Sequence, residues 1–215
     1  MMNQDRRRSD SYRERILKAA RQLFLEHGLD GVSMYMIART AGIGQGSLYR
    51  RYADIGEIGS DLLRDNTEKL LSGLEALVAG PITQGERDSH SDGADQADEE
   101  GLHLERLRSA IAQVVDFTDE HAELLLRIKS EFTGKKQLTQ FEHPIFEKLN
   151  GILTGLFRQA AQAGEIREVE PSFMGSALTA VLSPDLYLYQ QKVHGSTKAE
   201  IQRGILTLVN ALASK

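Results

Sequence analysis

The chain has 215 residues and a net charge of −5, with 40% hydrophobic and 27% charged residues, which is typical of a globular protein with its own core. It contains no cysteine, which excludes disulfides, thiolate metal sites and cysteine nucleophiles and suits the reducing cytoplasm where we expect the protein. No window approaches about eighteen consecutive apolar residues and no secretory signal follows the N-terminal arginines, so we expect neither a membrane helix nor export.

Three helices are predicted in the N-terminal quarter of the chain. Apolar residues at helical spacing predict the first over residues 11–27, and Gly28 follows where a left-handed C-cap is easiest for glycine. Ser33 is a suitable N-cap for a second helix. Gly42 ends that helix, because glycine tolerates the dihedral angles of a tight turn, and a third helix is expected over residues 45–52.

The rest of the chain is also predicted to be mainly helical. A continuous apolar stripe predicts one long helix over residues 55–79, ending at Gly80-Pro81. Further helices are predicted over 102–121, 122–134, 144–164, 171–194 and 198–213. Pro184 lies inside the fourth of these ranges and should kink or break it. No segment alternates with a period of two between turn residues, so we expect no strand.

Residues 83–101 differ in kind from the helical segments. They include no Val, Leu, Ile, Met or aromatic residue, and they carry seven acids against one arginine. Such a segment buries too little apolar surface to offset the entropy lost on ordering, so we expect a disordered acidic loop. Two interpretations stay open for His90 and His103, which lie near these acids: ligands of a cation, or parts of a solvated spacer.

The net charge conceals an asymmetry along the chain. Residues 1–52 carry ten Lys and Arg against five Asp and Glu, hence +5, and residues 53–215 carry sixteen against twenty-six, hence −10. A basic N-terminal part is attracted to phosphate while the acidic remainder is repelled, which would orient the molecule on a nucleic acid. The same asymmetry also arises by chance, so its meaning depends on the motif within it.

The segment from Ser33 to Tyr52 carries the most informative motif. Two short helices that cross steeply need small residues where their backbones approach, and Ala38 and Ala41 meet that need. A small core should then be filled by Leu23, Phe24, Ile37, Ile43 and Leu48. The remaining polar and aromatic side chains would face outward, and these residue types bind phosphates or read base edges in the major groove. The pattern therefore predicts a helix-turn-helix that binds DNA.

The stretch from Tyr12 to Leu63 resembles the N-terminal domain of the TetR/AcrR family of transcriptional regulators. The matching residues are Ile16, Ala20, Phe24, Gly28, Ile37-Ala38, Ala41-Gly42-Ile43, Gly46-Ser47-Leu48-Tyr49 and Tyr52. The resemblance implies an all-α fold, with a three-helix DNA-binding domain at residues 9–64 and a helical ligand-binding and dimerisation bundle at residues 65–215.

The resemblance also implies individual roles. Gln45 and Arg50 align with positions that often face bases, and Tyr35 aligns with one that often touches the DNA backbone. The full set of expected DNA-binding residues is Ser33, Tyr35, Gln45, Gly46, Ser47, Tyr49, Arg50, Arg51 and Tyr52.

Two positions depart from the family pattern. Ile55 stands where a phosphate-binding lysine is usual, and Gly44 stands where a capping serine is usual. Both departures would weaken DNA binding. Arg50, Arg51 and the run of arginines at residues 6–8 would offset this loss, provided that the run is an ordered arm and not a flexible tail.

The partners implied by the resemblance are a palindromic double-stranded DNA operator, a second copy of the chain and a small-molecule effector. Repression is the family default. Helix 55–79, which joins the two domains, is expected to transmit effector binding to the DNA-binding domain. Residues 171–194 and 198–213 would form the homodimer interface, although their apolar stripes suit an internal core equally well. The expected ligand pocket, whose aromatic residues suit a core as well, comprises Phe117, His121, Glu131, Phe132, Phe146, Asn150, Phe157 and Tyr187.

Two rival functions belong to other classes. An enzyme is not expected, because the six histidines are scattered and the sequence has no H-E-x-x-H motif, no serine elbow and no phosphate loop. For the same reason we expect no catalytic residue, metal or cofactor. The alternative is a helical interaction protein that keeps this fold with weakened or lost DNA binding.

Overall fold

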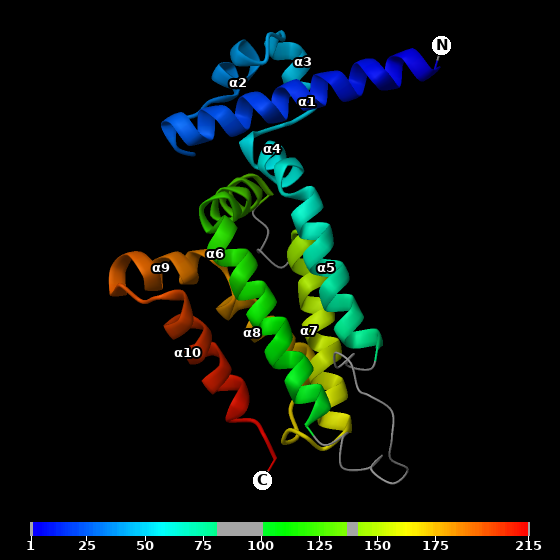
Figure 1. The fold of residues 1–215 in the computed structure, drawn as a ribbon, viewed down its shortest axis with the longest axis vertical. Helices are drawn as coiled ribbons and strands as arrows, with labels where there is room; N and C mark the ends of the chain where they lie inside the picture. The colour runs from blue at the N-terminus through cyan, green and yellow to red at the C-terminus, as the bar shows by residue number, and fades with distance from the viewer. Residues whose placement is uncertain (1, 81–100, 137–141, 215) are drawn as a thin grey trace, which may run out of the picture. The chain divides into compact units, whose positions relative to one another are not determined.

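The computed structural model describes residues 2–80, 101–136 and 142–214, and side chains over 11–80, 101–133 and 142–214 (Figure 1). These residues form ten α-helices and no strand, apart from an isolated antiparallel bridge between Ile166 and Ala213. The all-α prediction is therefore confirmed. The predicted acidic loop at 83–101 falls outside the described residues, except for Gly101.

The chain divides into two compact units. The N-terminal unit consists of Met1–Asn66 together with Glu123–Gln140, and the C-terminal unit consists of Thr67–Ala122 together with Phe141–Lys215. The helix α6 (Leu102–Lys136) contributes to both units. The sequence-based boundary after residue 64 did not assign the last part of α6 to the N-terminal unit.

The N-terminal helices are α1 (Met2–His27), α2 (Met34–Thr40), α3 (Gln45–Tyr49) and α4 (Ile55–Leu62), and α2 packs against both α1 and α3. Helix α1 begins nine residues before the predicted start. Residues 2–10 carry no apolar stripe that would predict a helix, but they also contain neither glycine nor proline to stop one. The arginines at residues 6–8 therefore belong to a helix and not to a flexible tail.

The local signals around the motif act as expected. Gly28 and Gly42 have φ angles of +69° and +63°, in the left-handed region that favours glycine. The Ser33 hydroxyl accepts a hydrogen bond from the backbone nitrogen of Met36 at 3.3 Å, which caps α2. Helix α3 is shorter than predicted, since its last α-helical residue is Tyr49.

Two further predictions, about where helices are continuous, are wrong. The continuous helix expected over residues 55–79 is two helices, α4 and α5 (Arg64–Ala79), which meet at Leu63. Neither glycine nor proline marks this break, so apolar spacing alone runs straight through it. Conversely, the two helices expected over 102–134 are one, because α6 runs without interruption from Leu102 to Lys136.

The C-terminal unit also contains α7 (Pro144–Gln162), α8 (Pro171–Val181), α9 (Pro184–His194) and α10 (Lys198–Asn210). The first three of these helices begin with proline, whose missing N–H is harmless in a first turn. The break predicted at Pro184 is confirmed.

Helices α7 and α8 approach each other closely at Gly175. A Cβ atom at this position would lie 2.9 Å from the backbone nitrogen of Thr154 and closer still to its hydroxyl. On α7, Leu153, Leu156 and Phe157 are fully buried. Absence of a side chain at Gly175 thus sets the distance between the two helices.

Candidate nucleic-acid interface

The small core behind α3 is the one that the sequence predicted. Leu23, Ile37 and Leu48 are buried, and Phe24 and Ile43 pack against them as partly buried residues. Leu48 is the only residue of α3 in this core and has no exposed surface. Its burial fixes how the short helix is rotated.

The rotation set by Leu48 turns the neighbouring side chains outward. Gln45, Tyr49, Arg50 and Arg51 are exposed and Ser47 is half-buried, while the glycine at position 46 is open to solvent. Tyr49 is 54% exposed and Tyr35, on α2, is 55% exposed. An exposed tyrosine offers an apolar ring and a hydroxyl, which suits contact with a sugar–phosphate backbone.

Two residues of the expected contact set serve a structural purpose. The Ser33 hydroxyl caps α2, as described above. The side chain of Tyr52 is only 6% exposed, and its hydroxyl donates to the carboxylate of Asp61 at 2.5 Å. Tyr52 therefore lies in the core and not on the outward face, because the chain turns back between Tyr49 and α4.

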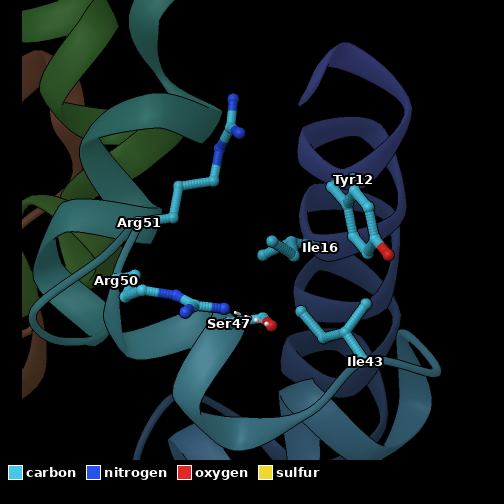
Figure 2. A pocket seen from close by; sticks show the side chains of 6 residues that line it. All are labelled: Tyr12, Ile16, Ile43, Ser47, Arg50 and Arg51. Atoms are coloured by element: carbon cyan, nitrogen blue, oxygen red, sulfur yellow. Dashed lines mark hydrogen bonds between the residues drawn. The ribbon is translucent and has the colours of Figure 1, made fainter. Parts of the chain in front are cut away.

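A hollow of about 480 Å³ lies between α1 and α3. It is lined by Tyr12, Ile16, Ile43, Ser47, Arg50 and Arg51. Figure 2 shows Arg50 reaching along it to the Ser47 hydroxyl, at 3.1 Å, whereas Arg51 points away from Ser47. None of these six lining residues is acidic, and two are arginines, so the hollow suits an anion such as a phosphate.

A buried carboxylate, that of Asp61 on α4, lies behind this surface. Arg13 of α1 binds it in a bidentate manner, with its Nε and Nη2 atoms each 2.8 Å from a carboxylate oxygen. Arg64 pairs with it at 2.6 Å, and Tyr52 donates to it as stated above. Sequence reasoning missed this residue. One sign of it was present in the sequence: this acid follows Ile58 by about one helical turn, which places it on the apolar side of the helix.

The titration of these groups follows from their contacts. Burial by itself raises the pKa of Asp61, but hydrogen bonds from Arg13 and Tyr52 outweigh burial, and the pKa lies below its usual value. Burial and the hydrogen bond to Asp61 raise the pKa of Tyr52 to about 12. At neutral pH the aspartate is therefore ionised and the tyrosine is neutral.

The two positions that depart from the family pattern differ in their surroundings. Ile55 is 5% exposed and belongs to the same core as Leu48. Gly44 is the N-cap of α3 and provides no side-chain hydrogen bond. The site therefore lacks a cation at the start of α4, and its two arginines follow α3.

The eight expected pocket residues are divided between the two units. Glu131 and Phe132 belong to the N-terminal unit, where Glu131 pairs with Arg127 at 2.8 Å. Within the C-terminal unit, Phe117 and His121 lie on α6 with their rings edge to face at 4.9 Å. The others in that unit are Phe146, Asn150 and Phe157 on α7 and Tyr187 on α9. Apolar spacing did not reveal this division, because α6 contributes to both units.

Most of the expected pocket residues in the C-terminal unit have packing or hydrogen-bonding roles. Phe157 is fully buried, and Asn150 accepts a hydrogen bond from Ser176 at 3.3 Å. Tyr187 donates to Asp119 at 2.5 Å. A hollow of about 260 Å³ lies among α8, α9 and α10, and of the eight residues Tyr187 alone is among those that line it.

The described part of the chain offers neither a metal site nor a membrane-spanning helix. No group of three or more His, Cys, Asp or Glu residues there is arranged to hold a metal ion. No helix in that part combines the length and apolar character needed to cross a membrane.

The helix-turn-helix segment is similar to that of known transcriptional regulators. Residues 16–58 match the family of bacterial regulatory proteins called the tetR family. An HTH-type transcriptional regulator of Staphylococcus aureus is 23% identical over 146 residues, which cover 68% of this chain and 67% of that protein. A second one from the same species is 44% identical over 46 residues, which cover 21% of this chain and 25% of its own length.

The fold of the whole chain also has a counterpart. The TetR-family repressor FadR of Thermus thermophilus, solved in complex with lauroyl-CoA, superposes with a TM-score of 0.64 at 21% identity. The superposition covers 92% of this chain and 93% of that one. The N-terminal match and the shared helical fold together lead to one conclusion: residues 16–58 form a helix-turn-helix segment like that of the tetR family, and the chain has the fold of solved TetR-family regulators.

Proposed function

We propose that the protein is a sequence-specific DNA-binding repressor that acts as a homodimer and is released from a palindromic operator by a small molecule. The observation that carries the DNA-binding part is the arrangement of α3. Leu48 is completely buried, while Gln45 and Tyr49 on the same short helix, and Arg50 at its C-cap, are exposed. A rigidly held helix with such side chains outward fits the major groove of a duplex.

The contact residues divide by chemistry. Arg50 and Gln45 read base edges, since a guanidinium or an amide bonds two base atoms at once. Ser47, Tyr49, Arg51 and the Gly46 backbone bind phosphates from α3 and the turn after it, while Tyr35 and Ser33 do so from the α2 side. The hollow beside α3 accepts one of these phosphates. Tyr52 is not a contact in this proposal, because its side chain is buried.

A mobility-shift titration at two salt concentrations tests DNA binding, with the region upstream of the protein's own gene as the probe. If each protomer makes about four phosphate contacts, the logarithm of the dimer's binding constant should fall with the logarithm of salt concentration at a slope of about −7. A flat response would instead favour a helical interaction protein of the same fold. The buried Ile55, in place of a cation, is the observation that favours that alternative.

The homodimer forms through α8, α9 and α10 in this proposal. These helices carry large apolar side chains in the open: Phe173 is 68% exposed, Val193 62% and Leu208 60%. Covering them with a second copy removes apolar surface from water. Two-fold pairing would present two α3 helices to successive major grooves. Sedimentation of wild-type protein and of Phe173→Glu tests this, because a charge on the interface should shift the dimer toward monomer.

The effector binds the C-terminal unit and releases DNA only if it binds the non-DNA-bound geometry more tightly. The fold shared with FadR, which was solved with lauroyl-CoA, supports an amphipathic effector and makes this acyl-CoA the first probe. Addition of the probe to the protein–DNA complex should reduce the shifted band. A series of acyl chains and other small molecules that leaves the complex intact would contradict ligand release while leaving DNA binding in place.

A further inference from the structure

The carboxylate of Asp61 accepts three hydrogen bonds and forms one further ion pair. Oδ1 faces Nη2 of Arg13 at 2.8 Å and Nη2 of Arg64 at 2.6 Å. Oδ2 faces Nε of Arg13 at 2.8 Å and the Tyr52 hydroxyl at 2.5 Å. An ionised carboxylate offers about four lone-pair positions; three hydrogen bonds use them here, and the Arg64 guanidinium adds an ion pair.

The donors come from three different segments of the N-terminal unit. Arg13 lies on α1, Arg64 begins α5 and Tyr52 follows α3, while Asp61 itself lies on α4. The Asp61 side chain is 5% exposed and that of Arg13 is 33% exposed. A buried charge is tolerated only when its partners are held in place, so the four segments meet in one defined arrangement.

Helix α3 depends on such external support. It has only five residues, and its N-cap provides no side-chain hydrogen bond. A helix this short is not stable by itself, because few hydrogen bonds offset the ordering of its backbone. Two buried side chains fix it in space: Leu48 within the helix and Tyr52 just after it, whose backbone nitrogen donates to the Leu48 carbonyl at 2.9 Å.

We propose that Asp61 and Tyr52 are positioning residues for the DNA-reading surface, and that the Tyr52–Asp61 hydrogen bond fixes the C-terminal end of α3 against α1 and α4. This inference rests on the proposed DNA binding. The outward Tyr49 and Arg50 lie between the two anchors, Leu48 and Tyr52. Removing one anchor lets this end of α3 move, which degrades base reading more than it weakens attraction between phosphates and arginines.

Exchange of backbone amide hydrogens tests the anchoring without DNA. Tyr52→Phe removes only the hydroxyl and leaves the buried ring in place. Amides of residues 48–52 should exchange roughly tenfold faster in this variant, since a hydrogen bond to a charged group is lost. Ser60→Ala is the matched control, because it deletes a hydrogen bond of α4, from the Ser60 hydroxyl to the Gly56 carbonyl at 2.9 Å, without touching Asp61. Equal exchange in both variants and in wild type overturns the anchoring.

A second experiment connects the anchor to DNA. The probes are a duplex enriched by the wild-type protein from a random-sequence pool and a scrambled duplex of the same composition. For Tyr52→Phe we expect the ratio of the two dissociation constants to fall roughly tenfold, while affinity for the scrambled duplex stays within about twofold and keeps its salt dependence. Mere loss of folded protein would weaken binding to both duplexes alike.

The outcomes separate the two proposals. If the wild-type protein enriches no sequence, the proposed DNA binding fails and the positioning role fails with it. If a sequence is enriched but Tyr52→Phe discriminates as well as wild type and Ser60→Ala do, the positioning role alone is overturned. A second variant, Asp61→Asn, should lose discrimination in the same way, because it removes the charge that holds the Arg13 guanidinium and Tyr52 hydroxyl together.

Discussion

Each of the two units contains a tyrosine that donates to an aspartate at 2.5 Å, yet the surroundings of the two aspartates differ. In the N-terminal unit, the Asp61 side chain is 5% exposed and is bound by two guanidinium groups besides Tyr52. In the C-terminal unit, the Asp119 side chain is 35% exposed, and its other partners are the Gln191 amide and Lys198 at 4.0 Å. A carboxylate near water needs few partners, whereas a buried one needs all of its acceptor positions filled. The tertiary arrangement of the N-terminal unit therefore depends on a charge.

The C-terminal unit contains a close contact between two helices that involves no charge. Thr154 of α7 lies against Gly175 of α8, with no room for a methyl group between them. Leu153, Leu156 and Phe157 complete this apolar contact region. Steric fit of this kind is insensitive to pH and salt, whereas the Asp61 network is sensitive to pH. Perturbing the two units should therefore give different responses.

The largest effect is expected from Asp61→Ala. It leaves the Arg13 guanidinium and the Tyr52 hydroxyl without their partner in a buried site, which should lower the free energy of unfolding by about 3–5 kcal/mol. Asp119→Ala should lower it by about 1 kcal/mol, because its carboxylate is partly in water. Urea unfolding of both variants measures the difference. Equal losses would show that burial of the carboxylate does not distinguish the units.

An intermediate effect is expected from Gly175→Ala. The added methyl group must push α7 and α8 apart, which should lower the free energy of unfolding by about 1–3 kcal/mol. Gly151→Ala on α7 is the control, because a Cβ atom there meets nothing within 4 Å. That control should be neutral or stabilise α7 by up to about 1 kcal/mol. A stable Gly175→Ala variant would contradict the proposed role of close packing.

A comparable effect, but on DNA affinity and not on stability, is expected from Arg50→Ala. Its side chain is exposed, so unfolding should be unchanged, whereas binding should weaken by about 1–3 kcal/mol at its cognate base and preference there should relax. Tyr49→Ala should weaken all sequences alike. Titration against duplexes altered one base at a time measures both variants. The reverse pattern would show that the roles of these two residues were assigned the wrong way round.

The last effect is expected from alkaline pH, and only above pH 10. The pKa of Tyr52 in the folded protein, about 12, exceeds the value of about 10 for an unfolded tyrosine, so its stabilising contribution is complete below pH 10 and declines as pH rises toward 12. The Tyr52→Phe variant has no hydroxyl to ionise, so it should lose less stability at alkaline pH than the wild-type protein does. The pKa of Asp61 is lowered, so its contribution persists above about pH 4 and is lost as pH falls further. Urea midpoints of wild type and variant across pH provide the test.

Much of the candidate interface could be predicted from the sequence. The Ser33 cap, the left-handed glycines 28 and 42, and the buried Leu48 are where the sequence indicates, and the structure shows the expected exposure of Tyr35 and Tyr49. Contact of these residues with DNA stays a prediction. The placement of Tyr52 could not be read from its type, because its hydroxyl is satisfied by a residue nine positions away, on another helix.

The sequence by itself determined the features that depend on neighbouring residues: helix ends, the turn before α3 and the apolar spacing behind it. Only the tertiary structure decided the features that join distant residues, such as Arg13 with Asp61, 48 positions apart, and the close approach of Thr154 to Gly175. The same holds for α6, whose last part packs with the N-terminal unit. The physical reason is that a cap or a turn is satisfied within a few residues. The partner of a buried charge, or of a glycine without a side chain, is chosen by how whole helices pack.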